Sequence, residues 1–344
     1  MRWNDFAVCG DALGRYAAGV TRQASTGGEM LIAAPERWDE ACFAAPAVRA
    51  MLATGVGVGV LCAADQRGFW ETLTGLTVVD FPVKTKARTL AATLGGNWQA
   101  ALLWEPGLAA EACARAKIPR RLGPAEKPLK KFLTHPVPLA AADRPLEHRV
   151  RHYLAILETM GLDTGRAEFF AAVDLGGPRQ AQSLLLCPDS DFGRTYEWPV
   201  ERWVELGQAL LANGWALTLA GLPSGNRAGA RLLEKLGGEL PFFQIDSLAG
   251  LLPVLATQAV VLAADGSLPH LAAHVGATCV TLFGPNDPAW KRPLGVMHAV
   301  VHRHVACAPC FLTKCPLDSR CQNELTVERV LAAVNLSAAS RDRP

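Results

Sequence analysis

The chain has 344 residues, of which 50% are hydrophobic and 19% charged, and its formal net charge is +2 at pH 7. This composition excludes a disordered chain and leaves enough apolar residues for two domains with hydrophobic cores. The small net charge argues against a general nucleic-acid-binding protein, and no apolar run approaches the about 20 residues of a membrane-spanning helix.

The first 28 residues form a lead-in segment to which we assign no function. They include Asp5 and Asp11 and lack a long apolar stretch, so we expect no secretory signal. The protein is therefore expected in the cytoplasm, where its ten cysteines would be mostly thiols.

Apolar runs and helical patterns then alternate. Short apolar runs predict strands at Met30–Ala34, Val56–Cys62, Leu76–Phe81 and Trp98–Trp104. Helical patterns follow them at Ala41–Ala53, Gln66–Leu73 and Leu108–Ala116. Strands that alternate with helices are typical of an α/β domain with a parallel sheet.

The segment from Ile118 to His135 is strongly basic. From Arg115 to His135 there are seven Lys or Arg residues against one acid, Glu126. One interpretation is a solvated loop; the other is a surface that faces an anionic acceptor or membrane headgroups. An amphipathic helix at Leu146–Gly161 follows, and we expect the first domain to cover residues 29–165 with a linker at 166–180.

A second alternation begins at residue 181. Strands are predicted at Ser183–Cys187, Ala216–Ala220, Phe242–Ile245, Ala259–Ala264 and Thr278–Phe283. Helices are predicted at Val200–Ala212, Arg227–Leu236, Leu248–Thr257 and Thr326–Val334. We therefore expect two Rossmann-like domains around a central cleft, the second at residues 181–335, and a tail at 336–344.

The turn after Ala264 is a candidate anion site. Asp265, Gly266 and Ser267 form a turn with a natural N-cap, and Pro269 suits the first turn of a helix. Free N–H groups and the helix dipole both favour a phosphate at such a place, and His270 lies within reach. The alternative is an ordinary crossover with a capped helix.

This stretch resembles the signature segment of glycosyltransferase family 9, the ADP-heptose:lipopolysaccharide heptosyltransferases. In that family an Asp, a Ser or Thr, a Gly and, three residues after that Ser or Thr, a His open the helix, and F-G-P-x-D-P closes the next strand. Asp265–His270 and Phe283–Pro288 fill these places, with the Gly and Ser transposed relative to the usual order.

A second resemblance covers the loop CPDSDFGRTYEWP at residues 187–199. It is similar to the family's C-P-G-x-x-x-G-x-x-K-x-W-P loop, so Ser190 and nearby amides are expected to hold a phosphate. The family's Lys falls on Tyr196, and Arg194 is the residue that could supply the charge. The alternative is a plain connection between a strand and a helix.

A third resemblance identifies the candidate base. Counting back from Pro46 places the family's catalytic Asp on Glu40, with Asp39 as the rival. A carboxylate here would accept the proton of an acceptor hydroxyl as that oxygen attacks the anomeric carbon. The alternative is that both acids cap the helix that starts near Ala41.

Two further stretches bear on the binding of the donor ribose and of a metal ion. Where the family often has a Glu for the donor ribose, this chain has Gly225 and Asn226. Four cysteines near the end of the chain resemble a small zinc or iron knuckle that would clip the second domain: Cys307, Cys310, Cys315 and Cys321. The alternative for them is reduced thiols or an occasional disulfide.

Taken together, the resemblance implies a GT-B fold with the donor bound by the C-terminal domain and the acceptor by the N-terminal domain. It implies metal-independent, inverting transfer of a heptose from ADP-heptose to the lipopolysaccharide inner core, with no cofactor needed for catalysis. The departures at Glu40, Tyr196 and Gly225 leave two alternatives open. One is a related transferase with another nucleotide sugar or acceptor, and the other is a degenerate homologue that binds a glycan or partner. The cytoplasmic protein could also associate with the inner face of the inner membrane.

Overall fold

The computed structural model describes residues 30–94, 98–139, 146–223 and 227–341. The predicted lead-in segment, Gly225 and Asn226 lie outside these ranges. The chain divides into two compact units: residues 1–145 with 149–170, and residues 146–148 with 171–344. None of the helices in the described ranges is both long and apolar enough to span a membrane.

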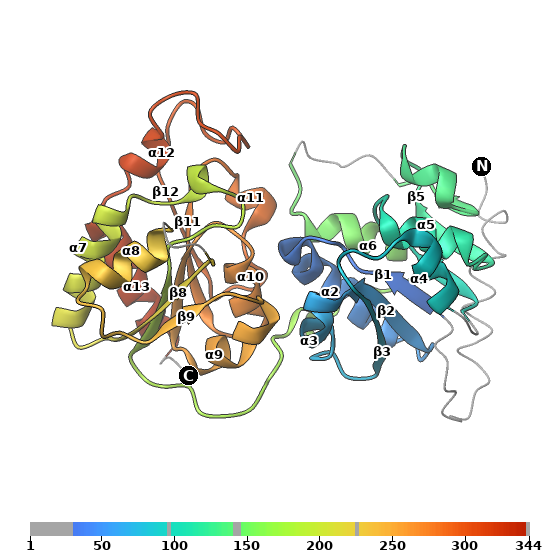
Figure 1. The fold of residues 1–344 in the computed structure, drawn as a ribbon, viewed down its shortest axis with the longest axis horizontal. Helices are drawn as coiled ribbons and strands as arrows, with labels where there is room; N and C mark the ends of the chain where they lie inside the picture. Colours follow the sequence, from blue (N-terminus) through green and yellow to red (C-terminus); the bar gives the residue numbers. More distant parts are fainter. Residues whose placement is uncertain (1–29, 95–97, 140–145, 224–226, 342–344) are drawn as a thin grey trace. The chain divides into compact units, whose positions relative to one another are not determined.

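The first unit contains a six-stranded sheet in which every strand pair is parallel (Figure 1). Its order is β3-β2-β1-β4-β5-β6. The strands are β1 (Met30–Ala33), β2 (Val58–Ala63), β3 (Leu76–Phe81), β4 (Ala100–Leu102), β5 (Arg120–Pro124) and β6 (His135–Val137). All four residues of the central strand β1 are buried, as the apolar run predicts for a strand covered on both faces.

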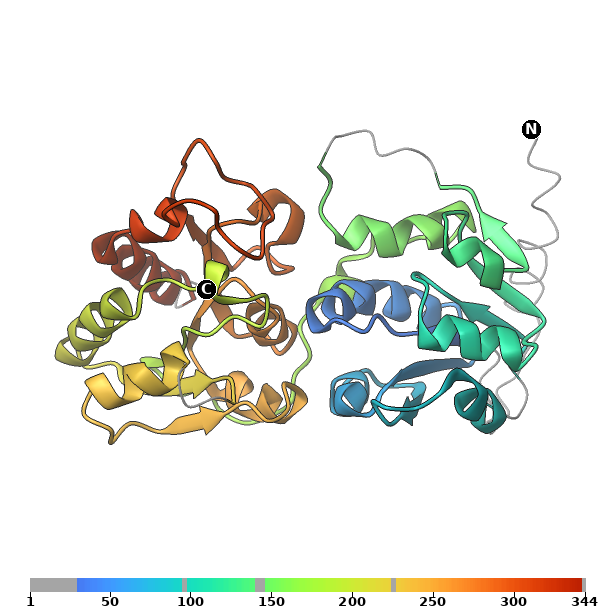
Figure 2. The ribbon, with the colours of Figure 1, turned by 45° about the horizontal axis from the view of Figure 1, so that its top comes forward.

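Helices connect these strands. They are α2 (Trp38–Leu52), α3 (Arg67–Trp70), α4 (Ala87–Thr93), α5 (Leu108–Arg115) and α6 (Val150–Thr159). Figure 2 shows α2, in blue, beside α6, in green, and the two helices are in contact. This packing buries Phe43 and Met51 of α2 and Leu157 of α6 completely, so the amphipathic pattern predicted for α6 is confirmed.

Of the two interpretations of residues 118–135, the solvated loop does not hold throughout, because this segment contains β5, which pairs with β6. Leu122 and Leu129 are buried, while Lys127, Lys130 and Lys131 are exposed. The guanidinium of Arg121 donates to the carbonyl oxygens of Phe132 (2.7 Å) and Ile118 (2.5 Å). The two short strands could not be recognised in this basic segment, because their apolar positions are too few to show an alternating pattern.

The backbone of β5 is closely packed at Gly123, which a substitution can test. A Cβ atom at Gly123 would lie 2.3 Å from the backbone oxygen of Leu103, and a backbone atom cannot move aside as a flexible side chain can. We expect Gly123→Ala to lower the free energy of unfolding by about 1–3 kcal/mol, measured as a shift in the urea midpoint. Gly165→Ala is the control, since its Cβ would only make an ordinary 3.6 Å contact. Equal midpoints for the two variants would contradict this packing.

The second unit repeats the architecture with the sheet order β12-β11-β10-β7-β8-β9, again entirely parallel. Its strands are β7 (Ser183–Cys187), β8 (Ala216–Gly221), β9 (Phe242–Gln244), β10 (Val260–Ala264), β11 (Thr278–Phe283) and β12 (Ala299–His302). Its helices are α7 (Val200–Ala212), α8 (Ala228–Lys235), α9 (Leu252–Thr257), α10 (Leu268–His274), α11 (Pro288–Lys291), α12 (Arg320–Asn323) and α13 (Val327–Arg341).

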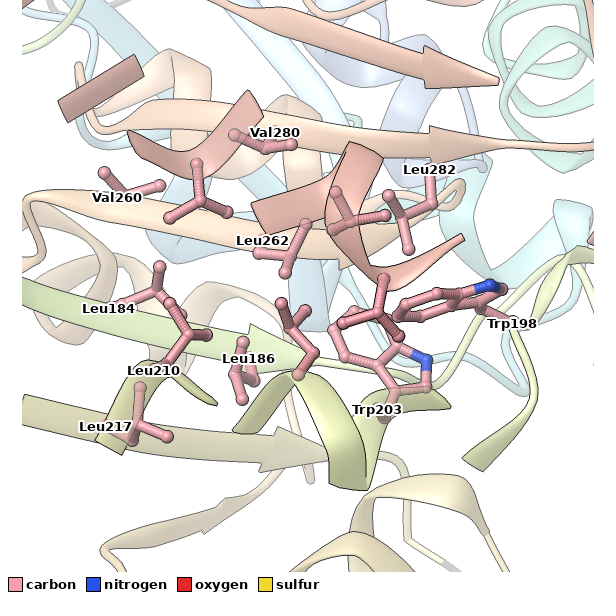
Figure 3. Packing of buried hydrophobic residues seen from close by; sticks show 14 of the residues in the cluster. Leu184, Leu186, Trp198, Trp203, Leu210, Leu217, Val260, Leu262, Val280 and Leu282 are labelled. Atoms are coloured by element: carbon pink, nitrogen blue, oxygen red, sulfur yellow. The ribbon is translucent and has the colours of Figure 1, made fainter. Parts of the chain in front are cut away.

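A large hydrophobic cluster of this unit lies on one face of its sheet (Figure 3). Leu186 of β7, Leu262 of β10 and Leu282 of β11 pack with Trp198 and Trp203, which are 1% and 0% exposed. Helix α13 extends beyond the predicted end at Val334, because Ala338 still packs against this core. The predicted tail is therefore helical through Arg341.

Each sheet follows the strand order 3-2-1-4-5-6 when its strands are numbered along the chain. This is the order of a Rossmann fold. The predicted α/β class with two Rossmann-like domains is therefore confirmed.

Candidate functional site

In a sheet of this order, ligands bind beyond the carboxyl ends of the strands, where the order reverses. This switch point lies between β1 and β4 in the first unit and between β7 and β10 in the second. In the second unit, the two loops that start there are the two segments that resemble the family's donor motifs, residues 188–199 and 265–267. The fold thus brings together segments that are about 75 residues apart in the chain.

Direct hydrogen bonds join the two loops. The Ser190 hydroxyl donates to the backbone oxygen of Asp265 (2.6 Å). The Asn286 amide donates to the Asp265 carboxylate (2.7 Å), which places the F-G-P-x-D-P segment at the same point. Ser190, Asp265 and Ser267 are at most 1% exposed. The predicted Ser190, Asp265, Gly266 and Ser267 therefore form one polar cluster.

Asp191 is a member of this cluster that the sequence did not indicate. Its carboxylate accepts hydrogen bonds from the Ser267 amide (2.8 Å) and the Ser267 hydroxyl (2.6 Å). A Cβ atom at Gly266 would lie 2.7 Å from an Asp191 oxygen, so a side chain there would displace the Asp191 carboxylate from its present position. The available signal was its place directly after Ser190 in a loop already expected to bind phosphate.

The expected N-cap is wrong in one respect. Ser267 occupies the N-cap position of α10, but its side chain makes no capping hydrogen bond and donates to Asp191 instead. The amide that we expected to face a phosphate is thus bound to a carboxylate of the same unit. The anion at this turn is the Asp191 carboxylate of the protein itself.

The other predicted donor residues lie in different surroundings. Tyr196 is only 4% exposed, and its ring packs edge-on against Phe192. A phenol carries no positive charge, so Tyr196 cannot supply that of the family's Lys. Arg194 is exposed in the same loop, whereas His270 is buried in the first turn of α10.

A second network, also missed from the sequence, holds the Ser190 loop. The Asp189 carboxylate, whose side chain is fully buried, accepts hydrogen bonds from the amides of Leu222 (2.8 Å) and Gly229 (3.2 Å). Arg227 lies 3.7 Å from this carboxylate and donates to the backbone oxygen of Ser190 (2.8 Å). The loop is therefore anchored on both sides of Ser190.

Glu197 completes this network. It accepts from the Ser190 amide (3.1 Å) and pairs with Arg227 (3.0 Å). Burial raises the pKa of the Glu197 carboxyl, while the Ser190 amide and Arg227 act in the opposite direction. The backbone of Ser190 is therefore fixed by side chains from its own loop and from the loop before α8.

In the first unit, both candidate base residues lie in the first turn of α2, and Arg37 is the N-cap residue. Asp39 is fully buried and pairs with Arg37 (3.0 Å). Glu40 is 5% exposed. One oxygen of Glu40 accepts from both Arg149 Nε (2.7 Å) and the Tyr153 hydroxyl (2.6 Å) of the α6 region.

The protonation of these partners is set by their surroundings. Burial, reinforced by the Glu40 carboxylate, raises the pKa of the Tyr153 hydroxyl, so Tyr153 stays protonated and donates. Burial alone would lower the pKa of Arg149, but Glu40 raises it overall. Burial and then Arg149 lower the pKa of His152 to about 4, so this ring is neutral at pH 7.

The cysteine cluster lies between β12 and α12. Cys307, Cys310 and Cys315 are partly exposed in the loop, and Cys321 is buried in α12. Hydrogen bonds from the backbone at Leu317 and Ser319 lower the pKa of Cys315. Across the described part of the chain, no three His, Cys, Asp or Glu side chains form an arrangement that could hold a metal ion. The zinc or iron knuckle stays a prediction, and no step below depends on it.

Known proteins resemble both the sequence and the fold. Residues 148–320 match the family model of Glycosyltransferase family 9 (heptosyltransferase). The lipopolysaccharide heptosyltransferase 1 of Pseudomonas aeruginosa is 30% identical over 178 residues, which cover 51% of this chain and 45% of that protein. The chain thus matches less than half the length of this relative.

Two solved structures share the fold. The structure of Escherichia coli ADP-heptose LPS heptosyltransferase II has a TM-score of 0.73 at 17% identity, covering 92% of this chain and all of the other. A family 9 glycosyltransferase from Veillonella parvula has a TM-score of 0.75 at 12% identity, covering 91% and 97% of the two chains. Their likeness confirms the predicted GT-B fold. With half of its length matched by the family model, the chain belongs to glycosyltransferase family 9, the heptosyltransferases.

Proposed function

We propose that this protein transfers a heptose from ADP-heptose to the lipopolysaccharide inner core or a closely related glycan. The observation that carries the proposal is the 2.6 Å hydrogen bond between Ser190 and Asp265, which joins the two donor motifs at the switch point of the second sheet. Support for the donor comes from the heptosyltransferases that resemble the chain.

The proposed reaction is a single inverting displacement. The oxygen of the acceptor hydroxyl attacks the anomeric carbon of the heptose, and the bond from that carbon to the diphosphate breaks. ADP leaves with the bonding electrons, and a carboxylate of the first unit takes the hydroxyl proton. The family motif assigns this carboxylate to Glu40, with Asp39 as the rival.

The leaving ADP carries growing negative charge, which donor groups and cations stabilise. We propose that the amides around Ser190 and Ser267 and the exposed guanidinium of Arg194 supply this stabilisation. His270, Asp265 and Gly266 shape the same turn, and the buried Tyr196 supports the loop. No metal ion is assigned a role in the displacement.

The basic segment around β5 is proposed to contact the acceptor or the membrane surface. Its exposed ammonium groups, at Lys127, Lys130 and Lys131, suit phosphate groups of a glycan or lipid. Sedimentation with anionic and with neutral vesicles checks the contact with a membrane. Binding to anionic vesicles that disappears when the three lysines are changed to glutamine supports this contact. Absence of binding to either kind of vesicle contradicts it.

A second candidate function is a homologue that binds a glycan or partner without transferring sugar. Two observations favour it: Tyr196 replaces the family's Lys, and the Asp191 carboxylate already occupies the amide and hydroxyl of Ser267. Such a protein would keep the fold and lose affinity for a nucleotide diphosphate.

Calorimetry with a panel of nucleotide sugars tests the proposed donor. Selective binding of ADP-heptose or ADP supports the heptosyltransferase proposal. Selective binding of a UDP- or GDP-sugar would contradict the ADP donor and favour a related transferase. Absence of binding to every nucleotide, with the protein folded by circular dichroism, would favour the second candidate.

Asp191→Ala makes a specific prediction about the same site. A diphosphate must displace the Asp191 carboxylate from Ser267 and is repelled by its charge, so removing it should tighten ADP binding about fivefold to tenfold. The matched control is Asp246→Ala, which removes an exposed carboxylate of the same unit that bonds to Gln244. Weaker ADP binding by the Asp191 variant would show that the carboxylate instead holds the turn in its binding shape.

A further inference from the structure

A buried lysine lies directly after the F-G-P-x-D-P segment. Lys291 is the last residue of α11 and is only 4% exposed. Lysine is seldom buried, because its amino group is normally a strongly hydrated cation. Burial of such a group is favourable where an anion or the face of an aromatic ring lies next to it.

The F-G-P-x-D-P segment itself positions this lysine. The Asp287 carboxylate accepts a hydrogen bond from the Ala289 amide (2.8 Å) at the start of α11. The Lys291 amide donates to the backbone oxygen of Asp287 (3.1 Å). The preceding residue, Asn286, donates from its side chain to the Asp265 carboxylate (2.7 Å). The helix that carries Lys291 is therefore anchored to the turn before α10.

Two aromatic rings hold the amino group of Lys291. Its Nζ atom lies 5.5 Å from the ring centroid of Phe192 and 4.9 Å from that of Trp290. Both distances are within the range of a cation–π contact, which extends to about 6 Å. The Trp290 ring packs in turn edge-on against Phe311, at 5.4 Å between centroids. The lysine side chain is therefore held between packed rings rather than extended into solvent.

Phe192 connects this lysine to the Ser190 loop. The Phe192 amide donates to the Ser190 hydroxyl oxygen (3.1 Å), and the Phe192 ring packs against Tyr196 (5.6 Å between centroids). Tyr196 occupies the position at which the family's loop has its Lys. Lys291 and Tyr196 thus contact the same ring, so the chain has a lysine beside the place from which the family's lysine is missing.

We propose that Lys291 binds the diphosphate of the nucleotide sugar and supplies the positive charge that Tyr196 cannot. The proposal rests on the proposed function and names a residue that the donor motifs do not. In the transfer reaction, the bond from the anomeric carbon to a diphosphate oxygen breaks, and this oxygen keeps the electron pair. A cation beside the diphosphate stabilises the charge that develops there. The exposed Arg194 has a smaller part, since water and salt screen an exposed charge.

Calorimetry of Lys291→Gln with ADP and with AMP tests the proposal. Gln is polar but uncharged, so we expect ADP affinity to fall about tenfold to hundredfold, the effect of losing a charged hydrogen-bond partner. AMP lacks the second phosphate group, and its affinity should fall much less. Lys235→Gln is the matched control, because Lys235 is an exposed lysine of α8 in the same unit; its ADP affinity should equal that of the wild type.

Two further variants separate the charge of Lys291 from its packing. Lys291→Arg keeps a cation that aromatic rings bind, so it should recover part of the lost ADP affinity. Lys291→Met keeps an unbranched side chain without the charge and should bind ADP as weakly as Lys291→Gln. A lysine with a purely structural role would give the opposite order, since Met fits between rings at least as well as Arg does.

Transfer kinetics measure the effect on the reaction. The charge on the diphosphate grows in the transition state, so kcat of Lys291→Gln should fall by about a hundredfold, with the acceptor KM unchanged. Arg194→Gln should lose less activity than Lys291→Gln. A larger loss in the Arg194 variant would show that Arg194, rather than Lys291, replaces the family's Lys.

The proposal can fail independently of the proposed function. Unchanged ADP affinity in Lys291→Gln, or equal losses for ADP and AMP, would overturn the role of Lys291 while wild-type ADP binding remains. A wild type that prefers UDP or GDP would overturn the proposed donor, and the same comparison of diphosphate with monophosphate would still decide the role of Lys291. Absence of binding to every nucleotide by the folded wild type would contradict both.

Discussion

Glu40→Ala is expected to lower the free energy of unfolding by about 3 kcal/mol, the lower end of the range for breaking a buried ion pair. The variant leaves the Arg149 guanidinium and the Tyr153 hydroxyl without the carboxylate that binds both at 2.7 and 2.6 Å. The lower end applies because 26% of the Arg149 side chain is exposed and water can partly replace the lost partner. The urea midpoint measures this loss, and hydrogen exchange of peptides from α2 and α6 locates it.

Glu40→Gln and Glu111→Ala are the controls for this experiment. Gln keeps an acceptor for Tyr153 and removes only the charge, so its loss of stability should be smaller. Glu111→Ala removes a partly exposed carboxylate that pairs with Arg115 and should change the free energy of unfolding by less than about 1 kcal/mol. A Glu40→Ala protein as stable as the wild type would show that the contact with Arg149 and Tyr153 contributes nothing to the fold.

Asp189→Ala should have a comparable effect in the second unit, again about 3 kcal/mol. The Asp189 carboxylate, whose side chain is fully buried, binds the amides of Leu222 and Gly229, and the variant leaves both amides without this acceptor. Arg227, with 16% of its side chain exposed, also loses its neighbouring charge. Because this network anchors the Ser190 loop, we expect nucleotide affinity to fall together with stability.

Asp189→Asn separates these two consequences. It keeps the shape of the side chain and one acceptor oxygen, so it should retain more stability than Asp189→Ala. The measurements are the urea midpoint and the calorimetric affinity for ADP on the same samples. Full nucleotide affinity in a destabilised Asp189→Ala protein would show that the network supports the fold but not the donor loop.

The strands and long helices could be predicted where burial imposes a clear pattern. The bounds of β3, β7, α7 and β11 agree with the prediction because apolar and β-branched residues dominate the three strands and α7 keeps a helical period. Strand β5 and the edge strand β6 were missed, since such short strands need few buried residues and their charged positions read as a loop.

The loops of the site were predictable from the motifs, whereas their partners were not. Ser190, Asp265 and Ser267 lie where the resemblance places them, at the switch point of the second sheet. Asp191 and Arg227 act through contacts to residues 37–76 positions away, and a spacing pattern in one sequence does not reveal such contacts.

The most direct test of the account is a transfer assay with ADP-heptose and a core acceptor that lacks the terminal heptose. We predict that the protein releases ADP in step with the acceptor's gain of one heptose, measured by chromatography and mass spectrometry. Binding of ADP-heptose without any product, or transfer from UDP- or GDP-sugars in its place, would contradict the proposed reaction.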